Sequence, residues 1–254
     1  MEKRGQATVF AIVGVVLVII VMLVYFLNDQ GFVPLSGTQN FLSGKMEPIK
    51  DKITECANDG VRDGMEIFGK QGGDFTPGNG LKYKGYNVKY YCGYLEGSCQ
   101  NNMPLLSSAE SSFEEYVINH MKGCVGEGVF QGGLGYEITK GEMEVDVSLN
   151  GDGVKVNTDY NVVISKGDDK LSMPKTKVTV TDVPFEDLYG VATDIIETLA
   201  TGNKFEQVGY MIDHRGEVMI DVDKPYPHVV YMLSKQDSNF ELWFAVEGKG
   251  EYIL

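Results

Sequence analysis

The pattern of apolar and polar residues begins with one continuous apolar run. Residues 7–27 carry no charged side chain. A helix of these 21 residues, rising about 1.5 Å per residue, would cross the ~30 Å hydrocarbon layer of a bilayer once. Lys3 and Arg4 precede the run. Because positive residues stay on the cytoplasmic side, the sequence predicts a cell membrane protein whose C-terminal domain is extracellular.

Helical spacing returns after a polar stretch. Residues 28–40 are interrupted by glycine and proline, which is typical of a linker. An apolar period near 3.6 residues then predicts a helix from about 41 to 69. The same spacing predicts two further helices, from about 108 to 123 and from 184 to about 201. Ser111 or Ser112 is the candidate N-cap of the first of these two.

A two-residue period predicts the strands. Residues 82–91 alternate aromatic and polar side chains, which indicates short strands around a turn. From 136 to 181 the alternation predicts a β-meander with one buried and one solvated face. Two or three more strands are expected, at 217–222, 228–234 and 240–246. Helices that alternate with antiparallel strands predict the α+β class.

These elements predict four parts of the chain. The cytoplasmic tip and transmembrane helix occupy 1–28, and a stalk or linker occupies 29–40. A helical, cysteine-containing subdomain is expected at 41–134, and an α+β subdomain rich in antiparallel strands at 135–254. The length after the apolar run is enough for one large or two small domains with a real core.

Four cysteines follow the apolar run, and an even number in an oxidising compartment predicts two disulfides. Of the three pairings we favour Cys92–Cys99, which closes a local loop, together with Cys56–Cys124, which clamps two predicted helices together. The spacing disfavours zinc, because there is no Cys-x-x-Cys and only His120 lies near a cysteine. We therefore expect a disulfide-stapled ectodomain with no metal and no cofactor.

The charge balance restricts the partners. The chain has 22 basic and 36 acidic residues, a formal charge of −14. Lys3, Arg4 and Glu2 precede residue 29, so the remainder keeps 20 basic and 35 acidic residues, or −15. Such a surface repels nucleic acid and anionic lipid headgroups, and we expect no nucleic-acid partner. An acidic exterior suits solubility outside the cell, or binding of cations or basic partners.

A short triplet offers the most enzyme-like chemistry. Asp213 and Arg215 flank His214, and His228 begins a predicted strand. A membrane-anchored ectoenzyme, a metal-dependent hydrolase using Asp213, His214 and His228, is therefore the alternative function. Sequence neighbours on a strand point to opposite faces, and Asp213 to Gly216 equally suits a hairpin turn. We expect no catalytic residue here.

Two other segments have a binding interpretation. Residues 148–159 partly match a calcium loop, with Ser148 and Asp159 at its end positions, but the flanking alternation favours a hairpin turn. The aromatic-rich segment 83–94 could form a recognition face, since tyrosine is favoured at interfaces. The alternative is that its tyrosines cover a small strand layer.

The opening segment has three interpretations. A cleaved secretory signal would have a shorter apolar core and a small-x-small cleavage site, which is missing here. An uncleaved signal anchor explains the apolar run alone. Arg4-Gly5-Gln6 before the run resembles the class III signal of archaeal pilins and archaellins. That resemblance implies recognition of Lys3, Arg4 and Gly5, cleavage after Gly5, Gln6 as the new N-terminus, and packing of the apolar helix into a filament.

The rest of the chain resembles single-pass surface proteins of small-genome archaea. They share a cysteine-bearing helix that ends near Gln-Gly-Gly, here residues 71–73, and a strand-rich remainder. The resemblance implies a surface location and brings no known activity. We expect a membrane-anchored extracellular protein with a structural, pilin-like or surface-binding role and no catalysis. Its expected partners are the lipid bilayer through residues 7–27, and further copies or other surface proteins.

Overall fold

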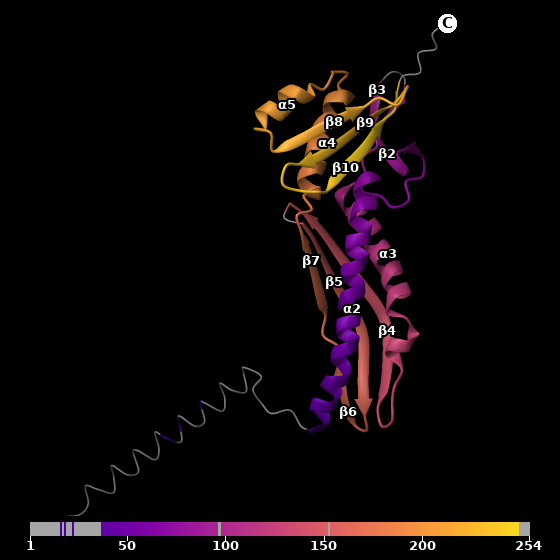
Figure 1. Cartoon of the computed structure of the whole chain (residues 1–254), viewed down its shortest axis with the longest axis vertical. Coiled ribbons are helices and arrows are strands. Elements are labelled where there is room, and N and C mark those ends of the chain that lie inside the picture. Colours follow the sequence, from indigo (N-terminus) through magenta and orange to yellow (C-terminus); the bar gives the residue numbers. More distant parts are fainter. Residues whose placement is uncertain are drawn as a thin grey trace, which may run out of the picture.

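The computed structural model describes residues 37–95, 98–151 and 153–248, together with Val16, Val18 and Met22. The rest of the predicted transmembrane helix, the first part of the linker, and the processing residues Gly5 and Gln6 lie outside the described residues. No helix within the described residues is long and apolar enough to cross a membrane. The described body is elongated, with one long helix beside a lower and an upper sheet (Figure 1).

The long helix α2, Gly37–Lys70, has 34 residues and starts inside the predicted linker. Its apolar side chains are buried from Leu42 to Phe68 at helical spacing, as the pattern predicts. The helix ends at the predicted turn, where Gly72 and Gly73 have φ angles of +74° and +69°. Glycine adopts this left-handed conformation without steric cost, so the chain can leave the helix abruptly.

The lower sheet is the predicted meander. It contains β4 (Glu137–Asn150), β5 (Gly153–Lys166), β6 (Asp169–Ser172) and β7 (Thr176–Thr181), all antiparallel. Strand β5 is central, with β4 on one side and β6 and β7 on the other. Pro174 lies between β6 and β7, and it has no backbone N–H for a ladder. The third strand of the meander is therefore divided into two short ones.

The upper sheet combines strands from both halves of the chain. Its members are β1 (Gly80–Tyr83), β2 (Tyr86–Leu95), β3 (Ser98–Asn101), β8 (Val218–Asp223), β9 (Val229–Lys235) and β10 (Glu241–Val246). Strand β10 pairs with β2 in parallel, with Val246 opposite Cys92. The main core is likewise continuous from α2 to β10. The subdomain boundary expected between residues 134 and 135 therefore does not divide the main hydrophobic core.

Besides α2, the described body contains four helical segments: α3 (Leu106–Val125), the short 3-10 helix η1 (Glu127–Phe130), α4 (Phe185–Ala200) and α5 (Gln207–Asp213). Helix α4 begins after Pro184, as predicted. The N-cap of α3 is Leu105, so neither Ser111 nor Ser112 is a cap. The Ser112 hydroxyl instead accepts a hydrogen bond from the Phe75 N–H at 3.2 Å.

Helices α2 and α3 pack closely because α2 has glycine at two positions that face rings of α3, where a larger side chain would not fit. A Cβ on Gly60 would lie 3.0 Å from the His120 ring, and one on Gly64 would lie 2.7 Å from the Tyr116 ring. The four contact levels between the two helices, about one helical turn apart, are Cys56–Cys124, Gly60–His120, Gly64–Tyr116 and Phe68–Phe113. The glycines that weaken the helical pattern in the sequence therefore make room for two rings of the facing helix.

Candidate functional site

The strongest candidate site is an aromatic cluster on the outer face of the upper sheet. Along β10, Leu242 and Phe244 enter the main core, whereas Trp243 and Ala245 belong to a second cluster. This follows from the two-residue period of a strand, which sends alternate side chains to opposite faces. Trp243 is at the centre of that second cluster and is only 6% exposed.

Two similar groups of side chains flank the Trp243 indole. Each has one tyrosine, one lysine and one carboxylate, and together with Trp243 they are called the distal aromatic face below. The first group is Tyr86, Lys70 and Glu66, and the second is Tyr83, Lys84 and Asp223. Lys70 ends α2, so the long helix contributes directly to this face.

The first group joins α2 to β2. The Tyr86 hydroxyl donates to Glu66 Oε1 at 2.7 Å, and Lys70 Nζ lies 2.8 Å from the same oxygen. Lys70 Nζ is also 5.1 Å from the centre of the Tyr86 ring and 5.2 Å from that of Trp243. A cation at this distance from an aromatic ring is attracted by its quadrupole.

The second group joins the end of β1 and the turn that follows it to the end of β8. The Tyr83 hydroxyl donates to Asp223 Oδ2. Lys84 Nζ lies 4.9 Å from the centre of the Tyr83 ring and 6.0 Å from that of Trp243. Both tyrosine rings meet the indole edge-on, with centroids 5.8 Å and 5.6 Å away.

The protonation states suit recognition better than proton transfer. The hydrogen bond to Glu66 raises the pKa of Tyr86, and burial followed by the bond to Asp223 raises the pKa of Tyr83. The pKa of Glu66 is lowered by its bonds from Lys70 and Tyr86. The pKa of Asp223 is lowered by its bond from Tyr83. At neutral pH these phenols therefore keep their protons and these carboxylates keep their charge.

Only part of the distal aromatic face was predicted from the sequence. Tyr83 and Tyr86 belong to the aromatic segment 83–94, but Tyr91 points the other way and stacks on Phe244 at 4.7 Å in the main core. Trp243 is far from this segment in the sequence and Lys70 lies outside it, and sequence reasoning missed both. The available signal was the unbroken apolar run Leu242–Val246, which is typical of a strand buried on both faces.

The enzyme candidates do not come together. Strands β8 and β9 pair from Val218–Lys235 to Asp223–Val230, about 17 Å along the sheet. His214 precedes β8 at one end of this pair, and His228 precedes β9 at the other. His214 stacks on Tyr210 with centroids 4.0 Å apart, and it follows Asp213, the last residue of α5. The sequence from Asp213 to Gly216 is therefore a helix end and not the turn of a hairpin.

His228 makes local contacts of its own. The Gly248 N–H donates to His228 Nδ1 at 3.3 Å, and the Tyr90 hydroxyl lies 3.3 Å from the same nitrogen. Within the described residues, no group of three or more His, Cys, Asp or Glu side chains could hold a metal ion. The arrangement provides no common site for Asp213, His214 and His228.

Residues 148–159, which partly match a calcium loop, belong to the β4–β5 hairpin that the alternating pattern favoured. Asn150 pairs with Gly153, so the turn between β4 and β5 has two residues. Ser148 pairs with Lys155 and Asp159 pairs with Glu144, about four residues further along the ladder. Asp159 also forms an ion pair with Lys175 at 2.8 Å. The proposed first and last calcium ligands are therefore well apart.

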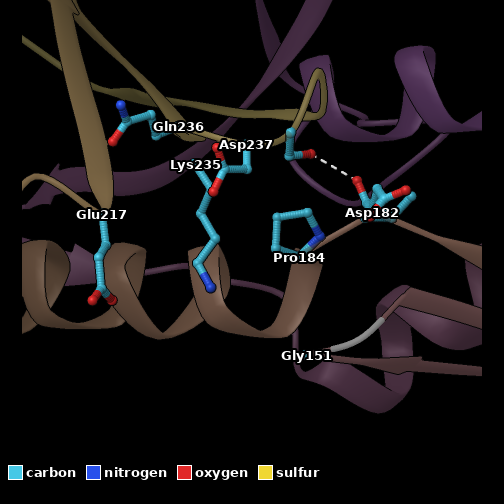
Figure 2. Close-up of a pocket in the computed structure, with 9 residues that line it drawn as sticks. Gly151, Asp182, Pro184, Glu217, Lys235, Gln236 and Asp237 are labelled. Atoms are coloured by element: carbon cyan, nitrogen blue, oxygen red, sulfur yellow. Dashed lines mark hydrogen bonds between the residues drawn. The ribbon is translucent and has the colours of Figure 1, made fainter.

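An open polar pocket of about 500 Å³ lies between the lower and upper sheets (Figure 2). Its lining residues are Gly151, Asp182, Val183, Pro184, Glu217, Lys235, Gln236, Asp237 and Ser238. Lys235 forms an ion pair with Asp187 of α4. The Ser238 hydroxyl donates to the Asp182 carbonyl at 2.7 Å and accepts from the Phe240 N–H at 3.0 Å. The lysine and the hydroxyl are thus engaged in structural contacts.

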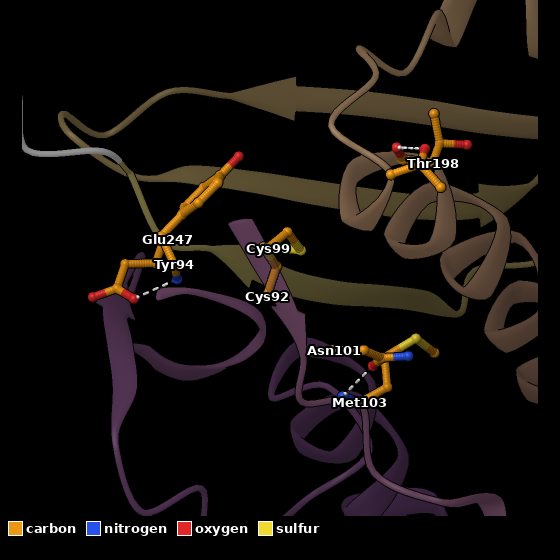
Figure 3. The surroundings of a disulfide bond; sticks show 8 residues. Cys92, Tyr94, Cys99, Asn101, Met103, Thr198 and Glu247 are labelled. Carbon is orange, nitrogen blue, oxygen red and sulfur yellow. Dashed lines mark hydrogen bonds between the residues drawn. A yellow bond between two sulfur atoms is a disulfide. The ribbon is translucent and has the colours of Figure 1, made fainter. Parts of the chain in front are cut away.

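Both expected disulfides are present. Cys56–Cys124 joins α2 to α3, and Cys92–Cys99 joins β2 to β3 at the end of the upper sheet (Figure 3). Beside the second bridge, the Tyr94 N–H donates to Glu247 Oε2 at 3.0 Å. This bond connects β2 with the residue that follows β10. The bridge and the bond therefore stabilise neighbouring pairings of the same strand.

Comparison with family models, curated proteins and solved structures finds no match to this chain.

Proposed function

We propose that this protein is a membrane-anchored surface protein with a structural or binding role and no catalysis. Residues 7–27 hold it in the bilayer, and the ectodomain presents the distal aromatic face to a partner. The supporting observation is the course of α2, which starts ten residues after the apolar run and ends at Lys70 beside Trp243. Its 34 residues span about 50 Å.

The long helix makes this proposal physically reasonable. A face carried directly by a packed helix keeps a fixed distance from the start of that helix. The core shared by α2 and both sheets supports such rigidity, as does the Cys56–Cys124 bridge. Disulfides also suit the oxidising environment outside the cell. The face therefore has the mechanical basis for display well above a membrane.

The pilin-like form of the proposal adds one processing step. A peptidase would cut after Gly5, and copies would then assemble through residues 6–27. The enzyme alternative gains no support, because His214 and His228 lie at opposite ends of the β8–β9 pair. Binding needs no such convergence, only the exposed parts of Tyr86, Lys70 and Lys84.

Intact mass of the protein from native membranes tests the anchor and the processing together. Non-reducing and reducing samples are compared after thiol labelling. We expect membrane-bound protein with no labelled thiol before reduction and four afterwards, because both disulfides should form outside the cytoplasm. A mass without Met1–Gly5 selects the pilin-like form, and a full-length mass selects the plain anchor. Four labelled thiols before reduction would refute the extracellular location.

A further inference from the structure

We propose that the end of the ectodomain where α2 begins rests on the bilayer surface, with Leu134 inserted among the lipid headgroups. This end, called the proximal end, comprises residues 37–46, 127–140 and 162–172. The start of α2 lies beside β6, at the far end of the body from the upper sheet (Figure 1). The inference rests on the proposed function, because it requires residues 7–27 to lie in the membrane.

Leu134 is the most exposed large apolar side chain among the described residues, at 105%. It occupies a tight turn in which the Tyr136 N–H donates to the Gly133 carbonyl at 3.2 Å. Gly135 has a φ of +85°, which favours glycine at that position. The turn therefore holds the leucine away from the protein, where water surrounds it. Contact with lipid would remove this apolar surface from water.

Aromatic rings and lysines lie directly behind this turn. Tyr136 contacts Phe41 of α2, with ring centroids 5.8 Å apart. Lys45 Nζ is 5.6 Å from the centre of the Tyr136 ring, and Lys166 Nζ is 4.1 Å from that of Phe41. Tyrosine and lysine suit the headgroup level, because each combines an apolar body with a polar tip.

The charge of the proximal end differs from that of the whole ectodomain. Its charged residues are Lys45, Lys140, Lys166, Lys170, Glu127, Glu137, Asp168 and Asp169. Four lysines and four carboxylates balance, whereas residues 29–254 together carry −15. The proximal end therefore escapes the net repulsion from anionic headgroups that the rest of the ectodomain experiences.

A hollow of about 470 Å³ adjoins the turn and offers room for a headgroup. It is lined by Gly133, Gly135, Tyr136, Glu137, Ser165, Lys166 and Gly167. Lys166 places an amine beside this space, where it can meet a lipid phosphate as a point charge. Leu134 lies between two of the lining glycines, so insertion of the leucine and entry of a headgroup would occur at the same place.

The covalent chain keeps this end close to the membrane. Ten residue steps separate Leu27 from Gly37, so the two are at most roughly 35 Å apart. Phe41 lies about one helical turn beyond Gly37. The proximal end is therefore the part of the described body that the anchor holds nearest to the bilayer.

Tryptophan fluorescence in proteoliposomes tests the inference. The full chain carrying Leu134→Trp is reconstituted in vesicles of phosphatidylcholine and phosphatidylglycerol, with or without bromine on the acyl chains. The matched control is Leu95→Trp, because Leu95 is 63% exposed at the end of β2 in the upper sheet. Trp243 gives the same background in both variants. Flotation of the vesicles shows independently whether the protein is anchored.

We expect both variants to float with the vesicles and only Leu134→Trp to show a blue shift and quenching by the brominated lipid. Equal quenching of the two variants, or no quenching of Leu134→Trp in protein that floats, would overturn the inference while leaving the anchor intact. Protein that fails to float would refute the proposed function itself. The two failures are therefore distinguishable in one experiment.

Discussion

The lower and upper sheets are both largely antiparallel, but they collect their strands from very different lengths of chain. All four strands of the lower sheet come from residues 137–181. The upper sheet joins residues 80–101 to residues 218–246, and its β2 and β10 are parallel. Val246 lies opposite Cys92, so more than 150 residues separate these partners. Only the lower sheet can form entirely from neighbouring hairpins, because the two sets of hairpins in the upper sheet meet through the long-range pairing of β2 with β10.

The two sheets also differ in the helices and disulfides that stabilise them. Helix α3 covers the edge of β4, where Glu114 accepts from the Val147 N–H and Glu110 from the Leu149 N–H, both at 3.1 Å. Cys56–Cys124 then fixes α3 against α2 over a separation of 68 residues. The upper sheet has only a bridge over 7 residues, Cys92–Cys99. The long-range disulfide thus lies between α2 and α3, the helix that covers β4 of the lower sheet, whereas the pairing of β2 with β10 in the upper sheet depends on core packing.

Removing each bridge in turn gives the largest expected effect. In the chain-entropy description, the separation of 68 residues makes Cys56–Cys124 worth about 4 kcal/mol. The separation of 7 residues makes Cys92–Cys99 worth about 2 kcal/mol. We therefore expect the double variant Cys56→Ser/Cys124→Ser to lose about twice the free energy of unfolding lost by Cys92→Ser/Cys99→Ser.

Denaturant unfolding of the full chain in detergent measures this ratio, and the two double variants serve as each other's control. A larger loss from Cys92→Ser/Cys99→Ser would contradict the comparison. It would mean that the long-range pairing of β2 with β10 depends on the local bridge more than α2 and α3 depend on theirs.

The same contrast explains how much of the fold was predictable. The two-residue period of Met143–Leu149 and of Val154–Ile164 specified β4 and β5, because both strands bury one face. The parallel pairing of β2 with β10 left no local signal, since it is decided by packing between distant segments. Helix α5 was missed because its 7 residues are too few to show a helical period.

The candidate site was less predictable for a related reason. Tyrosine enrichment pointed to the segment that includes Tyr83 and Tyr86. The centre of the face is Trp243, and Lys70 reaches it from the end of α2. Single residues on α2, β1, β2, β8 and β10 form a common face only after the chain has folded. The short His214 motif, in contrast, looked chemical in the sequence and has only local contacts in the structure.

Two glycines of α2 sharpen the comparison at the level of helix packing. Alanine at Gly44 meets nothing within 4 Å, so Gly44→Ala should stabilise the helix by up to about 1 kcal/mol. Alanine at Gly64 would place Cβ 2.7 Å from the Tyr116 ring. That ring is stacked on Phe75 at 4.0 Å and has little room to move. Gly64→Ala should therefore cost about 1–3 kcal/mol despite its better helix propensity.

Thermal and denaturant unfolding of the two variants give the answer, with Gly44→Ala as the control on the same helix. Stabilisation by Gly64→Ala would show that α2 and α3 are not held in close contact at this level. The Cys56–Cys124 bridge would then have to supply most of their association.

Replacing Tyr91 of the upper sheet should have the smallest effect on the free energy of unfolding at neutral pH, and a separate effect at alkaline pH. Its side chain is fully buried and its hydroxyl donates to the Gly72 carbonyl at 3.1 Å. Tyr91→Phe should therefore cost about 1 kcal/mol at neutral pH. Burial raises the pKa of Tyr91 far above its usual range, so the folded state holds a proton that the unfolded chain releases near pH 10.

A raised pKa stabilises the folded state below the unfolded pKa, and this contribution disappears as the pH rises further. Above about pH 10, Tyr91 should thus remove stability at about 1.4 kcal/mol per pH unit, and Tyr91→Phe should make the alkaline loss shallower by that amount. Tyr231, whose pKa burial also raises, keeps part of the slope in the variant. Denaturant unfolding at several pH values measures the difference. Parallel curves for both proteins would mean that the upper sheet opens to water around Tyr91 before the molecule unfolds, and that the distantly paired β2 and β10 separate first.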